Sequence, residues 1–251
     1  MTWKLEKKMK KLKSCILIEG LPGIGNVGKI AADLLLQELK ASPAAKFSSN
    51  MLPNAVFVQE DNMIEMPVVE FQHVKHKGKD FLFLVGDVQP TEEELSYKFT
   101  KSVLDFAQDN GCNEIVTLGG IGLQMIPEVP KVYCTANNKA LMQAFAKHGA
   151  KTDIYGKVGP IIGITGLLLG LGKERKIKAA ALLAETLAHP MYLGLRGAKE
   201  LMEVLNKRYD FGVSTDDLEK EIKENEEKMK NALSNTQQLQ GQEHPEMSYI
   251  G

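Results

Sequence analysis

Residues 15–40 constrain the fold of this chain more than any other stretch of the sequence. An apolar run at residues 15–18 leads into a turn rich in glycine and proline at residues 20–25. Beyond the turn, apolar residues recur at helical spacing on one face, namely Val27, Ile30, Ala31, Leu34, Leu35 and Leu39. A strand, a glycine turn and a helix in this order predict an α/β fold in which the helix packs on a sheet.

The glycine turn fits two nucleotide-binding motifs in part. Gly23, Gly25 and Gly28 spell GxGxxG, whose glycines let backbone amides approach a pyrophosphate at a helix N-terminus. With Lys29 they also spell GxxxxGK, but Ile30 stands where a P-loop has the Ser or Thr that holds magnesium. Two interpretations stay open: a phosphate site at these four residues, or glycines that shape a sharp turn and a close helix–sheet contact. We favour the second.

A second glycine turn follows another predicted strand. The apolar run 115–118 leads directly into Gly119, Gly120 and Gly122. Open α/β sheets bind ligands beyond the carboxyl ends of parallel strands, so two such turns predict a ligand pocket at one edge of the sheet. Asp87 follows the apolar run 81–85 as a Walker B aspartate would, although we favour a turn or capping role for it.

Hydrophobic spacing and turn residues predict the remaining elements. Strands are expected at 56–60, 68–74, 81–85, 115–118 and 132–135, and helices at 91–110, 138–148, 177–188 and 198–209. The first of these helices is expected to begin with a capping box formed by Thr91 and Glu94. We expect 41–53 to be a connection and 159–172 to be a buried loop that leads into a helical turn.

Charge and cysteine content bound the class of protein. The chain has 31 basic and 32 acidic residues among its 251, so it lacks the basic excess that nucleic-acid binding requires. The basic segment 1–13 precedes an apolar run too short to cross a membrane, and we expect a solvated, frayed start and no membrane partner. Cys15, Cys112 and Cys134 are widely spaced and odd in number, which fits a reducing cytoplasm and implies no disulfide framework.

The composition changes at Gly212. Residues 212–240 are highly charged and carry a weak heptad pattern that begins with Leu218 and Ile222, which predicts either a solvated helix or a helix that pairs with another chain. Residues 241–251 are expected to be a flexible tail. It ends in Met247, Tyr249 and Ile250, an apolar and aromatic group that suits a partner's pocket.

Motifs for catalysis are absent from the sequence. It has no GxSxG elbow, no HExxH helix and no paired-cysteine metal site. We therefore expect no catalytic residues, no metal and no cofactor, and a protein that acts by binding.

Taken together, four motifs resemble one known family. They are GLPGIGNVGKIAADLL at 20–35, GGIG at 119–122 followed by PKVYCTA, PIIGITGLLL at 160–169, and LLAETLAHP with the later GLRGAKELMEVL. Over residues 14–210 the chain resembles the archaeal branch of the PAC2 family, the relatives of proteasome assembly chaperone 2. The resemblance implies a three-layer α/β sandwich similar to purine nucleoside phosphorylases, with a central mixed sheet flanked by helices. It also implies a homo-oligomer whose partners are proteasome core subunits.

The resemblance divides the chain into a basic segment (1–13), a PAC2-like α/β domain (14–211), a charged C-terminal helix (212–240) and a tail (241–251). The expected function is that of a cytoplasmic, non-catalytic, assembly chaperone-like protein that binds proteasome core subunits. The alternative is a nucleotide-binding enzyme or regulator that uses the glycine-rich loop 23–29, because many family members carry labels that link them to ATP-grasp enzymes. Some members dock on the proteasome through a hydrophobic residue, tyrosine and a final residue, and Tyr249, third from the end, departs from that pattern.

Overall fold

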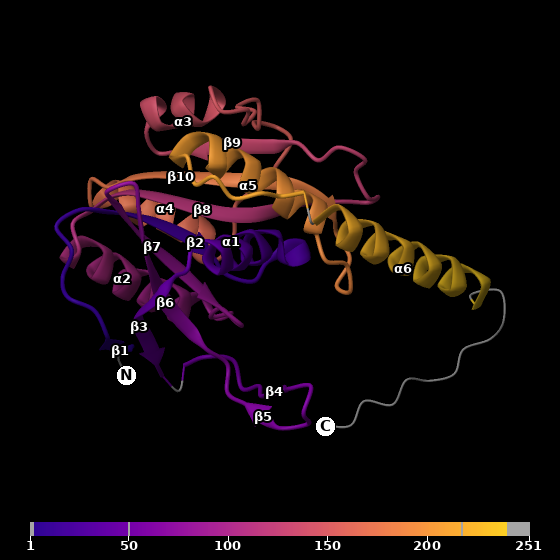
Figure 1. Ribbon diagram of the computed structural model, residues 1–251, viewed down its shortest axis with the longest axis horizontal. Helices are drawn as coiled ribbons and strands as arrows, with labels where there is room; N and C mark the ends of the chain where they lie inside the picture. The colour runs from indigo at the N-terminus through magenta and orange to yellow at the C-terminus, as the bar shows by residue number, and fades with distance from the viewer. Residues whose placement is uncertain (1–2, 50, 217, 240–251) are drawn as a thin grey trace.

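The computed structural model of the protein describes residues 3–49, 51–216 and 218–239, arranged around one large sheet (Figure 1). The strands are β1 (Lys4–Lys7), β2 (Cys15–Gly20), β3 (Ser42–Ser48), β4 (Phe57–Val58), β5 (Ile64–Glu65), β6 (Val69–His76), β7 (Lys79–Gly86), β8 (Cys112–Leu123), β9 (Val132–Ala136) and β10 (Lys178–Leu187). The helices are the 3-10 turn η1 (Ile24–Asn26), α1 (Val27–Glu38), α2 (Glu93–Asp109), α3 (Lys139–Ala146), α4 (Ile164–Glu174), α5 (Leu195–Tyr209) and α6 (Leu218–Leu239).

The large sheet is mixed, with eight strands in the order β1-β3-β6-β7-β2-β8-β10-β9. The central strands β7, β2, β8 and β10 run parallel to one another. At one side β6 pairs antiparallel with β7, β3 with β6, and β1 with β3, and at the other side β9 pairs antiparallel with β10. Parallel strands are covered on both faces, which explains why β7 reads as an uninterrupted apolar run.

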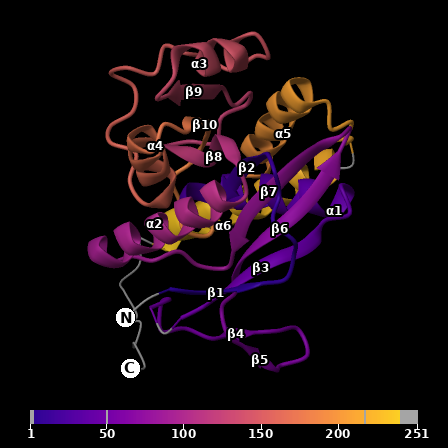
Figure 2. The same cartoon turned by 90° about the vertical axis from the view of Figure 1, so that its left-hand side faces the viewer.

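Helices cover both faces of the sheet (Figure 2). Phe81 and Phe83 of β7 pack in the core that α1, α3 and α5 complete, and Leu82 and Leu84 pack in the core beneath α2 and α4. Side chains of a strand alternate between its faces, so one short strand supplies both cores. The predicted fold class, an α/β sandwich with a central mixed sheet between two layers of helices, is confirmed.

The predicted helix at 177–188 is wrong, because this segment is the central strand β10. It lies between β8 and β9, and Ala179, Ala180, Ala181, Leu182 and Ala184 are fully buried. Alanine and leucine are typical of helices, but a surface helix also needs a polar face, and this buried run has none. Pairing on both sides and burial therefore override helix propensity at this position.

The predicted frayed start and the predicted connection at 41–53 are also wrong, since both contribute strands. β1 pairs antiparallel with β3, with Leu5 opposite Phe47. Trp3 is buried against Phe47 and Phe99, its ring centroids lying 5.9 and 4.8 Å from theirs. One tryptophan thus anchors a lysine-rich strand, and lysines on an exposed edge oppose pairing with other chains.

Three helices differ from expectation, α2 in its N-cap, α4 in its length and α6 in what it packs against. α2 begins at Glu93 and its N-cap residue Glu92 makes no side-chain capping bond, so the predicted capping box does not form. The stretch expected to hold one helical turn contains α4. α6 packs its start on its own chain, with Leu218 and Ile222 in the core of α5 and Glu226 accepting two hydrogen bonds from Arg196, 2.7 and 2.9 Å long. No helix in the described part of the chain is both long and apolar enough to cross a membrane.

Candidate functional site

The two glycine turns meet at the carboxyl edge of the central strands. α1 follows β2 onto one face of the sheet, whereas α2 follows β7 onto the other, so the chain reverses its winding between these two neighbouring strands. Ligands of open α/β sheets bind at such a switch point. The residues that follow β2, β7 and β8 therefore define the first candidate site.

Three glycines at this edge lie in close contact with neighbouring elements. A Cβ on Gly28 would lie 2.3 Å from the Leu118 carbonyl oxygen, and a Cβ on Gly120 would lie 2.4 Å from the Ile24 carbonyl oxygen. Gly25 has a φ of 60° and faces the Thr186 hydroxyl, 2.7 Å from where its Cβ would be. These glycines bring η1 and α1 against the ends of β8 and β10.

Gly23 differs from its neighbours because a Cβ there would meet no atom within 4 Å. It lines a cavity of about 460 Å³, the carboxyl-edge cavity, together with residues of the second glycine turn and of segment 157–162. Polar side chains in the lining come from Gln89, Thr165 and Lys157. Gln89 fixes the rim, because its amide nitrogen donates to the Pro22 carbonyl over 2.6 Å and its amide oxygen accepts from the Ile164 N–H over 3.4 Å.

Lys29 is engaged by carboxylates. Its ammonium lies 2.8 Å from Asp33 Oδ2 and 3.8 Å from Asp87 Oδ1, and Asp87 also accepts a 3.0 Å hydrogen bond from the Val68 N–H. Lys29 and Asp87 are the two charged residues that the partial nucleotide motifs indicated, and the structure brings them together as an ion pair. The described residues contain no cluster of three or more metal-ligating side chains.

A buried acid below this edge was not singled out by sequence reasoning. Glu19 ends the apolar run of β2 and is fully buried, with its two oxygens accepting hydrogen bonds from the Leu21 N–H (2.9 Å) and the Thr165 hydroxyl (3.2 Å). Burial raises the pKa of the Glu19 carboxyl to about 7, although these two hydrogen bonds offset part of the rise. An acidic residue near the end of a strand buried on both faces was the available signal in the sequence.

The chemistry of this edge favours uncharged ligands. The cavity presents glycine backbone, apolar side chains and the Gln89 and Thr165 side chains, while the Lys157 ammonium is paired with Asp153. A nucleotide requires cations or free amides directed at its phosphates. In this structure Lys29 and Lys157 are each engaged by carboxylates, and close packing accounts for Gly25, Gly28 and Gly120.

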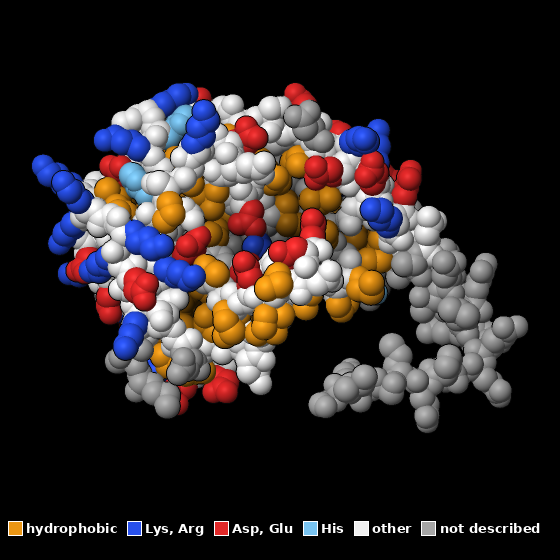
Figure 3. Space-filling model, turned by 60° about the horizontal axis from the view of Figure 1, so that its bottom comes forward, with side chains coloured by type: hydrophobic (Ala, Val, Ile, Leu, Met, Phe, Trp, Pro, Cys, Tyr) orange, Lys and Arg blue, Asp and Glu red, His pale blue; other side chains and the backbone are white. Residues whose placement is uncertain are grey.

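A second candidate site is the hairpin β4–β5, which pairs apart from the large sheet. Val58 lies opposite Ile64, and Val56 and Met66 lie two residues away, at the spacing that returns side chains to one face. These four residues, the apolar ribbon, are 51 to 71% exposed. The hairpin projects below the sheet in Figure 1, and Figure 3 views that side, where apolar side chains gather.

The exposed apolar ribbon indicates a binding surface for another protein. A two-stranded hairpin is marginally stable alone in water, and contiguous exposed apolar side chains mark interaction sites. A second group of exposed apolar residues follows the carboxyl edge, where Ile24, Met191 and Leu193 are 50, 78 and 44% exposed. The predicted partner-binding residues Met247, Tyr249 and Ile250 lie outside the described residues.

Comparisons with known proteins agree with this architecture. The chain is 30% identical over 218 residues to an uncharacterised protein of Methanocaldococcus jannaschii, covering 86% of this chain and 82% of the relative. Among solved structures it is similar to Pyrococcus furiosus PbaB, an archaeal proteasome activator, with a TM-score of 0.84, 29% identity and coverage of 92% of this chain and 98% of the other. Pyrococcus furiosus PbaA, an archaeal homologue of proteasome-assembly chaperone, shares the fold at 23% identity, with a TM-score of 0.75 and 94% of each chain covered.

The sequence model of the PAC2 family matches residues 17–233, a range that begins within β2 and ends within α6. The chain therefore belongs to the PAC2 family, as its motifs indicated.

Proposed function

We propose that the protein binds proteasome core subunits as a non-catalytic, chaperone-like factor of the cytoplasm. The apolar ribbon is the observation that carries the proposal. Unassembled subunits expose apolar surface that later becomes buried between neighbours, and a ribbon of four exposed apolar side chains can cover such surface. Similarity to a proteasome activator, at 29% identity over almost the whole chain, supports this choice of partner.

Binding of this kind needs no chemistry from the chaperone. Burying apolar surface on both partners supplies the favourable free energy, and the chaperone leaves when contacts between subunits replace it. Chaperone and neighbouring subunit then compete for the same surface.

A pull-down with recombinant proteasome α subunits tests the proposal. The full chain at about micromolar concentration is expected to retain isolated α subunits. Retention should weaken once the subunits have assembled into rings, because the competing contacts are then made. Failure to retain any α subunit, isolated or assembled, would contradict the proposal.

The C-terminal residues belong to the same proposal. We propose that 241–251 contribute a second contact, with Met247, Tyr249 and Ile250 seated in a pocket of the partner. Deleting 241–251 should then weaken binding and leave the thermal midpoint unchanged. Unchanged affinity after the deletion would show that residues 241–251 make no contribution to binding.

Self-association is a further part of the proposal, since an exposed apolar surface can be shared between copies. Light scattering coupled to size exclusion is expected to give a mass that is a multiple of the chain mass. A monomer at all concentrations would exclude self-association and leave subunit binding as the remaining role of the ribbon.

A further inference from the structure

Two free cysteines lie side by side at the amino ends of two central strands. Cys15 and Cys112 are register partners where β2 and β8 pair in parallel, and both belong to the core beneath α2 and α4. Adjacent strands run about 4.8 Å apart, inside the range of about 4.4 to 6.8 Å between Cα atoms that a disulfide spans. The register shifts immediately after Cys15, so this pair sits at an irregularity of the sheet.

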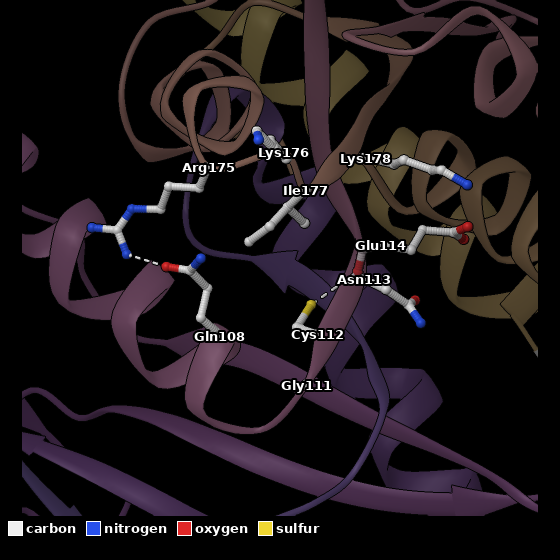
Figure 4. A pocket seen from close by; sticks show the side chains of 9 residues that line it. All are labelled: Gln108, Gly111, Cys112, Asn113, Glu114, Arg175, Lys176, Ile177 and Lys178. Atoms are coloured by element: carbon white, nitrogen blue, oxygen red, sulfur yellow. Dashed lines mark hydrogen bonds between the residues drawn. The ribbon is translucent and has the colours of Figure 1, made fainter.

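A cavity is lined by one of the two cysteines. It measures about 520 Å³, lies at the end of the sheet opposite the glycine turns, and is lined by Cys112 with residues of the α2–β8 and α4–β10 connections. Figure 4 shows Cys112 at this cavity with its sulfur turned toward the Glu114 carbonyl, which lies 3.2 Å away. Cys112 is 7% exposed and Cys15 is 3% exposed, so a small molecule meets Cys112 first.

Charged groups around the cavity are mainly cationic. Arg175, Lys176 and Lys178 line it together with a single acid, Glu114. The Arg175 guanidinium is held by Asp105 (2.6 Å) and by the Gln108 side-chain oxygen (2.8 Å). Of these charged groups, the Glu114 carboxylate acts on the Cys112 thiol and raises its pKa. The thiolate is the reactive form of cysteine.

The two thiols are not equivalent. A hydrogen bond between them lowers the pKa of Cys112 and raises that of Cys15, since the Cys15 S–H stabilises a thiolate on Cys112. Burial opposes the fall at Cys112 and adds to the rise at Cys15. Cys134, on the other face of the sheet, has its pKa raised to about 12 by burial.

We propose that Cys112 is a site of oxidation by hydroperoxides and that Cys15 resolves the product into an intramolecular disulfide. The Cys112 thiolate attacks the terminal peroxide oxygen and the O–O bond breaks. The alcohol or water that leaves takes up the proton that Cys112 had lost. Cys15 sulfur then attacks the Cys112 sulfenic acid, and the hydroxyl group departs as water with the Cys15 proton. Two thiols and one hydroperoxide become one disulfide, one alcohol or water, and one water.

The disulfide would tie the first residue of β2 to the first residue of β8. The N-terminal segment enters the sheet here, because the Leu12 N–H donates to the Asn110 side chain over 2.9 Å, next to the turn before β8. Oxidation would therefore fix the start of the central sheet covalently. The site is independent of the proposed partner binding, since the apolar ribbon lies elsewhere in the chain.

Peptide mapping of the full chain under non-reducing conditions tests the proposal. After treatment with one equivalent of hydrogen peroxide, the peptides of Cys15 and Cys112 are expected to be linked and Cys134 to stay free. Cys134→Ser should give the same linked peptide and serves as the matched control. In Cys15→Ser, oxidation should stop at a sulfenic acid on Cys112 that a dimedone probe traps.

A second measurement needs no variant. In the folded wild-type chain, limited alkylation followed by mapping should label Cys112 at least about tenfold faster than Cys15 or Cys134, as expected for the thiol with the lowest pKa. Equal rates at the three cysteines would overturn the proposal. So would a peroxide-treated chain in which no Cys15–Cys112 linkage forms.

Discussion

The glycine turns and the β4–β5 hairpin differ in two respects, namely how recognisable their sequence motifs are and how much surface they expose to a partner. Glycines 20–28 form the most recognisable pattern of the chain, yet Gly28 and Gly120 touch backbone atoms of neighbouring elements. The hairpin has no motif, and it exposes Val58 and Ile64 by 71 and 66%. The glycines with the recognisable motif therefore serve packing. The exposed apolar surface lies on the hairpin, which carries no motif.

The largest effect is expected at Gly28, where packing leaves no room. Gly28→Val should lower the free energy of unfolding by at least roughly 3 kcal/mol, because its Cβ would overlap the Leu118 carbonyl that closes α1 onto β8. Gly23→Val is the matched control, since Gly23 is extended (φ −160°) and its Cβ would meet open space. Chemical denaturation of both variants measures the difference in the free energy of unfolding. Equal stabilities would show that Gly28 is not more tightly packed than Gly23.

The next effect concerns the acid beneath the glycine turn. The folded chain keeps the proton on Glu19 up to about pH 7, whereas an unfolded chain loses it near the ordinary value of 4.5. Between these values the folded state binds more protons, so stability falls as pH rises, by roughly 2 kcal/mol between about pH 5 and about pH 8.

Glu19→Gln should remove this contribution, because a neutral amide keeps an acceptor for the Leu21 N–H and can donate to the Thr165 hydroxyl. The variant should match the wild type near pH 5 and exceed it at about pH 8 in denaturant unfolding. Glu38→Gln, on the exposed end of α1, is the control and should leave the pH profile unchanged. A wild-type profile that does not decline over this range would contradict the burial argument.

The hairpin should respond in the opposite manner, with function changing and stability not. Val58→Lys combined with Ile64→Lys replaces two exposed side chains, so the free energy of unfolding should change by less than about 0.5 kcal/mol. Thermal unfolding of the double variant measures this. A loss of several degrees in the midpoint would mean that the ribbon already packs on the rest of the chain.

The smallest effect is expected with nucleotide. Because Asp33 and Asp87 engage the Lys29 ammonium, Mg-ATP, ADP and NAD should leave the thermal midpoint of the wild-type chain unchanged. Lys29→Ala should change stability by less than about 1 kcal/mol, as expected for partly exposed ion pairs. Magnesium-dependent stabilisation that disappears in Lys29→Ala would instead restore a nucleotide role to the glycine turn.

Much of the fold was predictable from local pattern. Residues 15–40 gave a correct strand, turn and helix because their periodicities agree with their burial, and the two apolar runs at 81–85 and 115–118 became β7 and β8. β10 failed because alanine and leucine suit a helix when only the local sequence is considered. Its strand conformation is imposed by β8 and β9, which come from distant parts of the chain.

The candidate sites were less predictable for the same reason. The sequence indicated that two glycine turns would share an edge, but the contacts of Gly28 and the ion pairs of Lys29 depend on elements far away in the chain. The strand expected at 56–60 exists in part, as Phe57–Val58, yet no local pattern shows that it stands apart from the large sheet. Exposure of an apolar face is a property of the assembled fold.

The role of the apolar ribbon in binding is measured by the affinity of isolated proteasome α subunits for the ribbon variant, Val58→Lys with Ile64→Lys. The control is Met125→Lys with Val129→Lys, which makes the same change at two exposed apolar residues before β9. Val58→Lys with Ile64→Lys should weaken binding by at least about tenfold, while the control should bind like the wild type. Equal affinities of the wild type and the ribbon variant would show that the apolar ribbon does not bind α subunits.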